Sequence, residues 1–330
     1  MKRRGVDFVR LCEAHTEDSI NCGKIHKNGV LFFSMQAKPF VKWAGGKSQL
    51  LEKIREKYPQ KIKKYCEPFV GGGAVLFDIL NNFHPEKILI NDINKDLINT
   101  YSQVRDNPDM LISKLAELQD IYRNQSSEKN KELFYEKRSR FNELKISEND
   151  AENLEKAALF IFLNKNCFNG LYRVNKKGEF NVPFNNAKNP LICDEENLRA
   201  CSGLLQNVQM KTGDYSDCKD FIDSETFVYL DPPYRPLSKT SAFTSYTKNQ
   251  FSDKEQIELG NFIKEISEIG AKVLASNSDP KNANKEDNFF DELYSNFEIK
   301  RISASRMINS NAKKRGAISE LLISNIAALF

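Results

Sequence analysis

Residues 227–234 read Phe227-Val228-Tyr229-Leu230-Asp231-Pro232-Pro233-Tyr234. Four consecutive apolar or aromatic residues predict a buried strand, and the two prolines must end it because proline lacks a backbone N–H. Open α/β sheets bind their ligands at the carboxyl ends of their strands. A carboxylate, a proline carbonyl and an aromatic ring at such an end suit a planar molecule that bears an amino group. The alternative is an ordinary strand-ending turn, since Asp and Pro are common there.

Strand-like apolar segments recur along the rest of the chain, with helical patterns between most of them. The predicted strands are Lys64–Val70, Lys87–Ile90, Gln209–Thr212, Phe227–Leu230, Lys272–Ala275, Phe297–Ile302 and Leu321–Asn325. Apolar residues at three-to-four spacing predict helices over Gln49–Lys57, Gly73–Asn81, Lys95–Asp106 and Asp253–Ile269. This alternation predicts an α/β fold, a mostly parallel seven-stranded sheet with helices on both faces.

A long gap separates the second and third predicted strands. A single crossover needs far fewer residues, so we expect an inserted domain at residues 108–208. Three helices are predicted within it, over Pro108–Arg123, Glu128–Leu144 and Ala151–Leu163. Residues 36–107 and 209–330 then form the main domain. Residues 1–35 are expected to be an N-terminal extension outside the functional core.

Composition describes a globular protein with no strong electrostatic signature. Hydrophobic residues make up 40% of the 330 residues and charged residues 28%, with a net charge of +4. Global charge is therefore weak evidence for a nucleic-acid partner. Seven cysteines at irregular spacing and three scattered histidines argue against structural zinc and against a disulfide framework, as expected in a reducing cytoplasm. No apolar run approaches membrane-spanning length.

A glycine turn follows the first predicted strand in Cys66-Glu67-Pro68-Phe69-Val70-Gly71-Gly72-Gly73. Glycines let the backbone approach a ligand closely. The next strand ends in Asn91-Asp92, and an acid there can bind a ribose diol. The glycine spacing is not that of a dinucleotide site, so adenosine without a pyrophosphate fits better, and S-adenosylmethionine is the commonest such cofactor. The alternative role for Asp92 is a helix N-cap, and the two roles are compatible.

The segment Lys42-Trp43-Ala44-Gly45-Gly46-Lys47-Ser48 resembles a phosphate-binding loop only in part. A Walker A motif needs glycine five residues before Gly46, where Val41 stands, and no apolar strand precedes it. The NTPase interpretation therefore fails. Trp43 is the only tryptophan in the chain, and a core position is its structural alternative.

Taken in order, these motifs resemble those of the Dam-type DNA adenine methyltransferases, the alpha-group of the D12 class. Lys-Trp-Ala-Gly-Gly-Lys, Glu-Pro-Phe-Val-Gly-Gly-Gly, Asn-Asp-Ile-Asn and Asp-Pro-Pro-Tyr follow one another as in that family, over residues 36–326. The resemblance implies a Rossmann-like fold that uses S-adenosylmethionine to methylate the N6 amine of adenine in a short duplex DNA site. The implied cofactor residues are Trp43, Lys47, Glu67, Phe69, Gly71, Asp92, Asp214 and Asp231. Asp231 and the Pro232 carbonyl would accept the amino hydrogens of a flipped adenine, and Tyr234 would stack on the base. No metal is implied.

The inserted region carries a second resemblance, to the hairpin with which GATC-specific members read DNA. It covers residues 166–184, with a Lys-Lys-Gly turn at 176–178. Arg173 can grip a guanine edge, and Leu171 and Pro183 can make apolar contacts with bases. The DNA-binding residues that the resemblance implies are Lys42, Asn169, Leu171, Arg173, Asn175 and Pro183. The family often continues with Gly-Arg-Tyr, whereas Asn185-Asn186-Ala187 follows here. A surface hairpin with incidental basic residues is the alternative.

Two further loops are candidates for backbone contacts. Pro236–Gln250 is rich in hydroxyl groups, and Asn311–Gly316 carries three basic residues. Each could equally be a solvated surface loop. We expect a cytoplasmic monomer that acts on double-stranded DNA, and a separately encoded restriction endonuclease for the same site is a candidate partner. The alternatives are an RNA or cytosine amino-methyltransferase and a catalytically inactive DNA-binding relative.

Overall fold

In the computed structural model, the described residues are 24–27, 30–33, 35–147, 149–235, 251–305 and 317–326. Backbone contacts divide the chain into two units, Met1–Gln36 and Ala37–Phe330. The described part of the first unit is an antiparallel pair, β1 (Lys24–Lys27) and β2 (Val30–Phe33). Everything that follows concerns the second unit.

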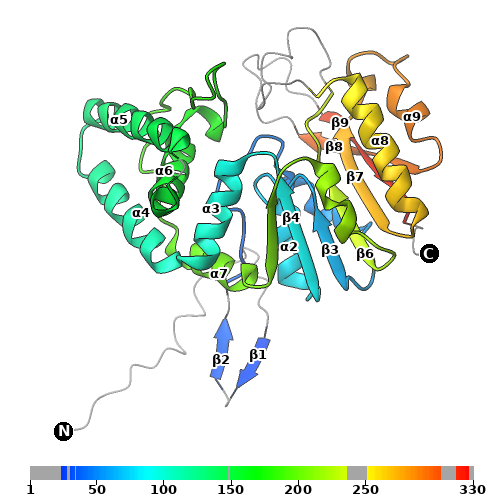
Figure 1. Ribbon diagram of the computed structural model, residues 1–330, viewed down its shortest axis with the longest axis horizontal. Helices are drawn as coiled ribbons and strands as arrows, with labels where there is room; N and C mark the ends of the chain where they lie inside the picture. Colours follow the sequence, from blue (N-terminus) through cyan, green and yellow to red (C-terminus); the bar gives the residue numbers. More distant parts are fainter. Residues whose placement is uncertain are drawn as a thin grey trace. The chain divides into compact units, whose positions relative to one another are not determined.

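The second unit contains a seven-stranded sheet in the order β5-β4-β3-β6-β7-β9-β8. The pairs from β5 to β7 are parallel, and β9 runs antiparallel to both β7 and β8. The mostly parallel sheet predicted from the sequence is confirmed, as are its seven strands (Figure 1). The strands are β3 (Lys64–Glu67), β4 (Lys87–Asp92), β5 (Val208–Thr212), β6 (Thr226–Leu230), β7 (Lys272–Ser278), β8 (Glu298–Ser305) and β9 (Ala317–Ser324).

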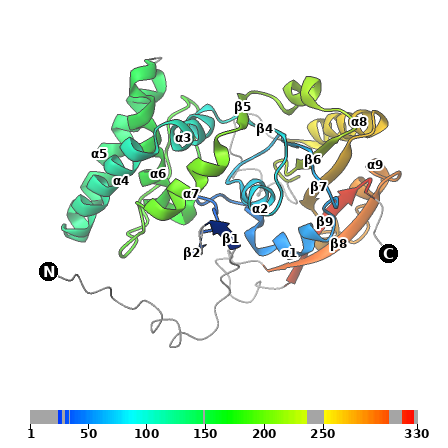
Figure 2. The ribbon, with the colours of Figure 1, turned by 90° about the horizontal axis from the view of Figure 1, so that it is seen from below.

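Helices cover both faces of the sheet, because successive strand residues point to opposite sides. In β6, Phe227 and Tyr229 join one hydrophobic core, whereas Val228 and Leu230 join the other. The first core also contains residues of α1 (Leu51–Arg55), α2 (Ala74–Asn82), α3 (Lys95–Asp106) and α7 (Glu195–Leu205). The second contains residues of η5 (Tyr215–Phe221), α8 (Asp253–Glu268) and α9 (Phe289–Leu293) (Figure 2).

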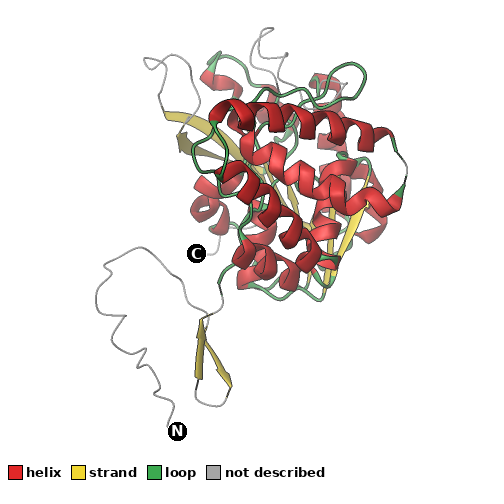
Figure 3. Ribbon diagram, turned by 90° about the vertical axis from the view of Figure 1, so that its left-hand side faces the viewer, coloured by secondary structure: helices red, strands yellow, loops and turns green. Residues whose placement is uncertain are grey.

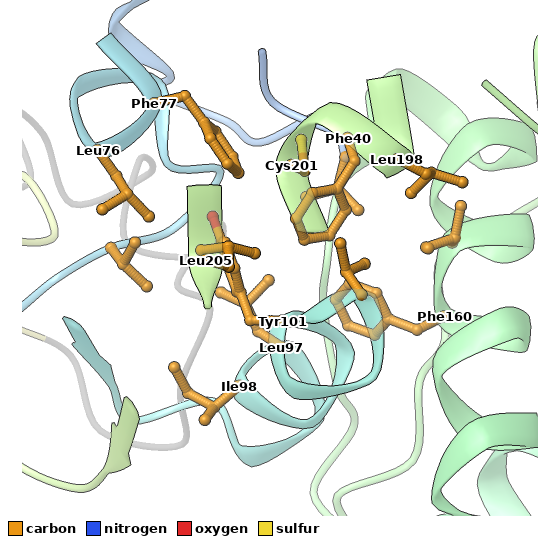
Figure 4. Close-up of a cluster of buried hydrophobic side chains, with 14 of the residues drawn as sticks. Phe40, Leu76, Phe77, Leu97, Ile98, Tyr101, Phe160, Leu198, Cys201 and Leu205 are labelled. Atoms are coloured by element: carbon orange, nitrogen blue, oxygen red, sulfur yellow. The ribbon is translucent and has the colours of Figure 1, made fainter. Parts of the chain in front are cut away.

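Three long helices lie between β4 and β5, close to their predicted positions. They are α4 (Pro108–Arg123), α5 (Ser127–Ile146) and α6 (Asn153–Asn166), and they stack beside one another in Figure 3. Seven consecutive residues of α6, from Ala157 to Leu163, are buried, since α6 packs against α3, α4 and α5 at once. Figure 4 shows part of this core, in which Phe160 of α6 lies near Leu97 and Tyr101 of α3, and Leu198 of α7 belongs to the same cluster.

Helix α7 was not among the predicted helices. Its signal was present, because the Asp194 side chain accepts a hydrogen bond from Asn197 N and two acids follow in the first turn. α7 packs against α2, α3 and α4. Within the described ranges, no helix combines the length and the apolar character needed to cross a lipid bilayer.

The topology predicts a crevice at the carboxyl ends of the central strands. From β3 the chain moves outward to β4, whereas from β6 it moves the other way to β7, so the order reverses between β3 and β6. Ligands of open α/β sheets bind outside the carboxyl ends of the strands at such a reversal. Glu67 ends β3, Asp92 ends β4 and Asp231 directly follows β6. Three carboxylates therefore lie together at the carboxyl ends of these strands.

Candidate active site

A cavity of about 1590 Å³ opens at the carboxyl ends of the parallel strands. It is lined by segments that lie far apart in the sequence, including Trp43–Lys47, Glu67–Gly73 and Asp231–Tyr234. All of the predicted cofactor and catalytic residues line it: Trp43, Lys47, Glu67, Phe69, Gly71, Asp92, Asp214, Asp231, Pro232 and Tyr234. The fold therefore brings these motifs to one place.

The Asp231 carboxylate is held from two directions. Lys47 Nζ donates to Asp231 Oδ2 at 2.7 Å, and Ser276 Oγ donates to Asp231 Oδ1 at 3.0 Å. Ser276 is itself 3.0 Å from the hydroxyl of Tyr229. Only 3% of the Lys47 side chain is exposed, against 20% for Asp231, so the ammonium lies beneath the carboxylate and leaves it the accessible partner. The turn at residues 43–47 fixes this lysine, because Gly46 N donates to Trp43 O and Lys47 Nζ donates to Gly45 O.

Tyr234 ends the segment Asp231–Tyr234, which lines the cavity after β6. Its hydroxyl donates to Glu320 Oε2 at 2.7 Å, and Lys47 Nζ lies 4.8 Å from the centre of its ring. Burial, with the nearby charges of Asp231 and Glu320, raises the pKa of Tyr234 well above its ordinary value. Tyr234 is therefore neutral, with its hydroxyl bound by Glu320 and the Lys47 ammonium over its ring. Pro232 between them is buried.

Trp43 rests directly on the glycine loop. A Cβ added at Gly71 would lie 2.8 Å from the indole, and one added at Gly72 would lie 2.9 Å from Trp43 Cβ. Gly71 also has a φ of +49°, which favours glycine. Trp43 is half-buried: it packs against the edge of the core and also lines the cavity. Trp43 therefore occupies both positions considered for it, at the core and at the wall of the cavity.

Asp92 joins the end of β4 to the glycine loop. Its Oδ2 accepts from Gly71 N at 3.0 Å and its Oδ1 accepts from Asn94 N at 2.9 Å. Burial raises the pKa of Asp92 to about 6, although both N–H groups oppose the shift. The N-cap role considered for Asp92 is wrong, because Asn94 caps α3 by accepting from Asp96 N and Leu97 N. Asp92 is thus left to face the cavity.

Glu67 lies deeper than Asp92 and is only 2% exposed. Its Oε2 accepts from the hydroxyl of Tyr65 at 2.7 Å. Burial, together with the charges of Asp231 and Asp92, raises the pKa of Glu67 well above its ordinary value. A cation placed in the cavity would lower that pKa again, since an opposite charge favours the ionised form.

An aromatic group forms the far side of the cavity. The ring of Phe69 lies 5.5 Å from that of Tyr215 and 6.2 Å from that of Phe251. Asp214 is exposed beside them, where its Oδ1 accepts from Ser216 N at 3.0 Å and caps η5. This end of the cavity therefore offers flat apolar faces beside a carboxylate.

Several residues of this site were not singled out from the sequence. Ser276 orients Asp231, Glu320 holds Tyr234, and Tyr215 and Phe251 flank Phe69. A signal existed for the first two. Ser276 lies in β7, where Ser276-Asn277-Ser278 are polar yet buried, and Glu320 is the only charged residue in β9. Polar side chains inside an apolar strand need partners, but the sequence does not name them.

These residues fit S-adenosylmethionine. Aromatic rings suit an adenine face, Asp92 can accept hydrogen bonds from two ribose hydroxyls, and buried acids suit a ligand that carries cationic groups. The glycines of the loop allow Trp43 to pack directly on the backbone that lines the cavity, because a Cβ at Gly71 or Gly72 would clash with it. Among the described residues, no group of three or more His, Cys, Asp or Glu side chains could hold a metal ion.

Antiparallel pairing is present where the hairpin was predicted, but as isolated bridges. Cys167 pairs with Phe184 and Val174 with Phe180, and the turn closes with Gly178 N donating to Asn175 O. Helix α5 supports the hairpin, because the Asn142 amide bonds both the N–H and the carbonyl of Phe180.

Among the predicted DNA-binding residues, Lys42 alone lines the cavity; Asn169, Leu171, Arg173, Asn175 and Pro183 lie along the hairpin outside it. The Asn164 side chain ties the two parts together, since it bonds the backbone of Lys42 and the carbonyl of Gly170. Arg173 is exposed, and its guanidinium donates to Asn181 Oδ1 and O. Leu171 is half-buried and Pro183 is exposed. The two loops Pro236–Gln250 and Asn311–Gly316 lie outside the described residues.

Comparison with known proteins agrees with this geometry. The pattern of the D12 class N6 adenine-specific DNA methyltransferase family matches residues 43–308. The type II methyltransferase M.MjaIII of Methanocaldococcus jannaschii is 50% identical over 297 residues, which cover 88% of this chain and 100% of that protein. The type II methyltransferase M1.LlaDCHI of Lactococcus lactis is 39% identical (87% and 95% covered), and the DNA adenine methylase of Haemophilus influenzae is 35% identical (87% and 93% covered). This chain therefore belongs to the D12 class N6 adenine-specific DNA methyltransferases, which take their methyl group from S-adenosylmethionine.

Proposed function

We propose that this enzyme methylates adenine within the duplex sequence GATC and flips the target base into the cavity to do so. One observation carries the proposal: the carboxylate of Asp231 and the ring of Tyr234 line the same cavity as Trp43, Glu67 and Asp92. A base inside a duplex cannot reach such a recess, and flipping it costs a few kcal/mol. Stacking on Tyr234 would offset part of that cost.

The cofactor would lie between the aromatic group of Phe69, Tyr215 and Phe251 and the segment Asp231–Tyr234. Phe69 and Asp214 would contact its adenine, Asp92 its ribose, and Gly71, Glu67, Trp43 and Lys47 its methionine part. S-adenosylmethionine supplies an electrophilic methyl group on a sulfonium. The assignment is supported by Phe69, whose ring packs beside Tyr215, and by Trp43, which lies against the glycine loop, since both line the cavity.

Asp231 and Pro232 would activate the adenine amine. The lone pair of that nitrogen is delocalised into the ring, so the amine is a poor nucleophile. Two acceptors, a carboxylate and the Pro232 carbonyl, draw its hydrogens out of the ring plane and localise the lone pair. Asp231 must be ionised to do this, and the ammonium of Lys47 lies 2.7 Å from its Oδ2. Positioning and electrostatics then supply the rate enhancement.

The hairpin would read the sequence from the major groove. Arg173 is exposed and its guanidinium is already oriented by Asn181, so it can present two donors to a guanine edge. Leu171 and Pro183 would make apolar contacts, and Asn169, Asn175 and Lys42 would complete the interface. The GATC assignment is supported by the motif in residues 166–184 rather than by any base-specific geometry.

The remaining parts of the proposal concern context. Residues 108–208 would form the target-recognition insertion, and residues 1–35 would be dispensable for catalysis. Two relatives are named type II methyltransferases, and another is the DNA N-6-adenine-methyltransferase of Escherichia phage P1. The two type II names support a role in restriction–modification, with a separately encoded endonuclease that cuts the same site. The enzyme would act as a monomer in the bacterial cytoplasm.

The test uses the full chain, radiolabelled S-adenosylmethionine and duplexes that contain one GATC site or the permuted site GTAC. We expect label in the first duplex alone, and mass spectrometry of its nucleosides should identify N6-methyladenine. Asp231→Ala should bind DNA but transfer no methyl group. Equal labelling of both duplexes would remove the GATC assignment. Comparable turnover by Asp231→Ala would remove the catalytic assignment.

A further inference from the structure

A polar cluster of three side chains lies between the cofactor loop and the hairpin. The hydroxyl of Tyr172 donates to Asp96 Oδ2 at 2.8 Å, and Lys145 Nζ lies 2.7 Å from the same oxygen. Lys145 Nζ also donates to the Tyr172 hydroxyl at 2.5 Å. Asp96 comes from α3, Lys145 from the last turn of α5 and Tyr172 from the hairpin. The cluster therefore joins three separate parts of the fold.

The Asp96 carboxylate makes this cluster rigid. Asp96 is 1% exposed, and its Oδ1 has no hydrogen-bond partner. A buried charge is tolerated only when it is compensated, and Asp96 lies in the first turn of α3, where Lys145 and Tyr172 both donate to its Oδ2. Loss of either donor would leave this buried oxygen with one partner fewer. The hydroxyl of Tyr172 is thus fixed in position.

The ring of Tyr172 connects this polar cluster to the proposed cofactor site. It stacks on Trp43 with the ring centres 6.2 Å apart and the planes at 21°. Trp43 in turn rests on Gly71 and Gly72, with no room for even a Cβ between them. Asp96, Lys145 and Tyr172 all line the cavity. A displacement of Tyr172 would therefore change the wall on which the cofactor lies.

The same residue bears on DNA reading, because Tyr172 is the direct neighbour of Leu171 and Arg173. Its ring packs against Phe160 of α6 and Phe180 on the opposite arm of the hairpin, at 5.6 Å and 5.8 Å. Tyr172 is the buried residue between two partly or fully exposed ones. Its hydroxyl anchors the arm that presents Arg173.

We propose that Tyr172, fixed by Asp96 and Lys145, is a positioning residue that couples cofactor binding to sequence reading. The inference rests on the proposed roles of Trp43 in the cofactor site and of Arg173 in the hairpin. It predicts that loss of one hydroxyl weakens cofactor binding and relaxes base discrimination together.

The decisive variant is Tyr172→Phe, which keeps the ring and removes the hydroxyl. The matched control is Tyr122→Phe in α4, where a buried hydroxyl donates to the Ala187 carbonyl at 2.8 Å without contacting the cavity. For Tyr172→Phe we expect a three- to tenfold higher KM for S-adenosylmethionine and a similar loss of discrimination against single-base-pair variants of the cognate site. Tyr122→Phe should change neither by more than twofold.

A second pair of variants guards against a general loss of structure. Lys145→Arg keeps the charge and should retain both properties, whereas Lys145→Met should lose both, as Tyr172→Phe does. If Tyr172→Phe and Lys145→Met are folded and both properties stay within twofold of the parent, the coupling is refuted. Trp43→Ala and Arg173→Ala separate this failure from that of the proposed function: if they too have no effect, the underlying site assignments fall.

Discussion

Lys47 Nζ lies 2.7 Å from Asp231 Oδ2, although 184 positions separate the two residues in the chain. The lysine is almost fully buried, whereas the carboxylate faces the cavity. The pair is therefore asymmetric. Removal of the acid leaves a buried cation that keeps the Gly45 carbonyl but has lost its carboxylate, whereas removal of the lysine leaves an acid that water can still reach.

This asymmetry predicts opposite effects on stability and activity. Asp231→Asn should lower the free energy of unfolding by about 3 kcal/mol, because an unpaired buried charge is costly. Lys47→Met should be milder in stability but should slow methyl transfer about 10²-fold, since the ionised acceptor loses its neighbouring cation. Urea denaturation and single-turnover kinetics measure the two quantities. The double variant Asp231→Asn with Lys47→Met should recover most of the stability and none of the activity. If the double variant is no more stable than Asp231→Asn, this account of the pair is wrong.

The hairpin gives a prediction about specificity. Arg173→Ala should cost about 1–3 kcal/mol of discrimination at one base pair, the usual contribution of a bidentate contact. Asn181→Ala should cause a smaller loss of the same kind, because Asn181 only orients the guanidinium. Relative kcat/KM values on duplexes with single-base-pair changes measure both effects.

Lys176→Ala is the control for this series, since Lys176 is an exposed cation in the turn of the same hairpin. It should weaken binding to all duplexes alike and reduce the salt dependence of binding. If Arg173→Ala behaves in the same uniform way, Arg173 contacts phosphate and not a base.

The sheet and the ends of its strands could be predicted because they depend on local sequence. Apolar runs such as Phe227–Leu230 are buried on both faces, and prolines or glycines mark where each run ends. In a parallel sheet, those ends are also where the ligand binds. The acids at Glu67, Asp92 and Asp231 were therefore placed correctly in one cavity.

The partners of these residues could not be predicted, since they depend on how distant elements pack. Glu320 reaches Tyr234 only because β9 inserts antiparallel next to β7, and no local pattern fixes that strand order. Likewise, Asp96, Lys145 and Tyr172 look like surface residues until three elements bury them. The support of the hairpin by α5 is also non-local, since Asn142 bonds the backbone groups of Phe180, the residue that bridges to Val174.

Asp92 predicts how cofactor binding depends on pH. With a pKa near 6, its carboxyl is increasingly protonated below pH 6, and a protonated acid loses an acceptor for the ribose hydroxyls. The affinity for S-adenosylmethionine should therefore be constant above pH 7 and approach a tenfold fall for each pH unit below 6. Isothermal calorimetry between pH 5 and 8 measures it.

The stability of the unbound protein should show the opposite sign. A raised folded-state pKa means that the folded state holds its proton more tightly than the unfolded one, so the contribution of Asp92 falls as pH rises from about 4 to 6. Asp92→Asn should flatten both profiles over that range. Should the variant keep the parent's binding profile, another acid such as Glu67 controls the pH dependence.

Trp43 predicts a direct optical signal for cofactor binding. It is the only tryptophan in the chain and it lines the cavity, so all tryptophan emission comes from the site. Addition of S-adenosylmethionine should change that emission with a single saturable curve whose midpoint matches the calorimetric Kd.

Gly71→Ala should abolish the response, because its Cβ would lie 2.8 Å from the indole and its φ of +49° costs an L residue about 1–2 kcal/mol. Gly178→Ala is the matched control, since Gly178 also has a positive φ but no atom lies within 4 Å of an added Cβ. It should therefore carry similar backbone strain and keep the signal. Loss of the signal in both variants would show that strain alone, and not contact with Trp43, explains the effect.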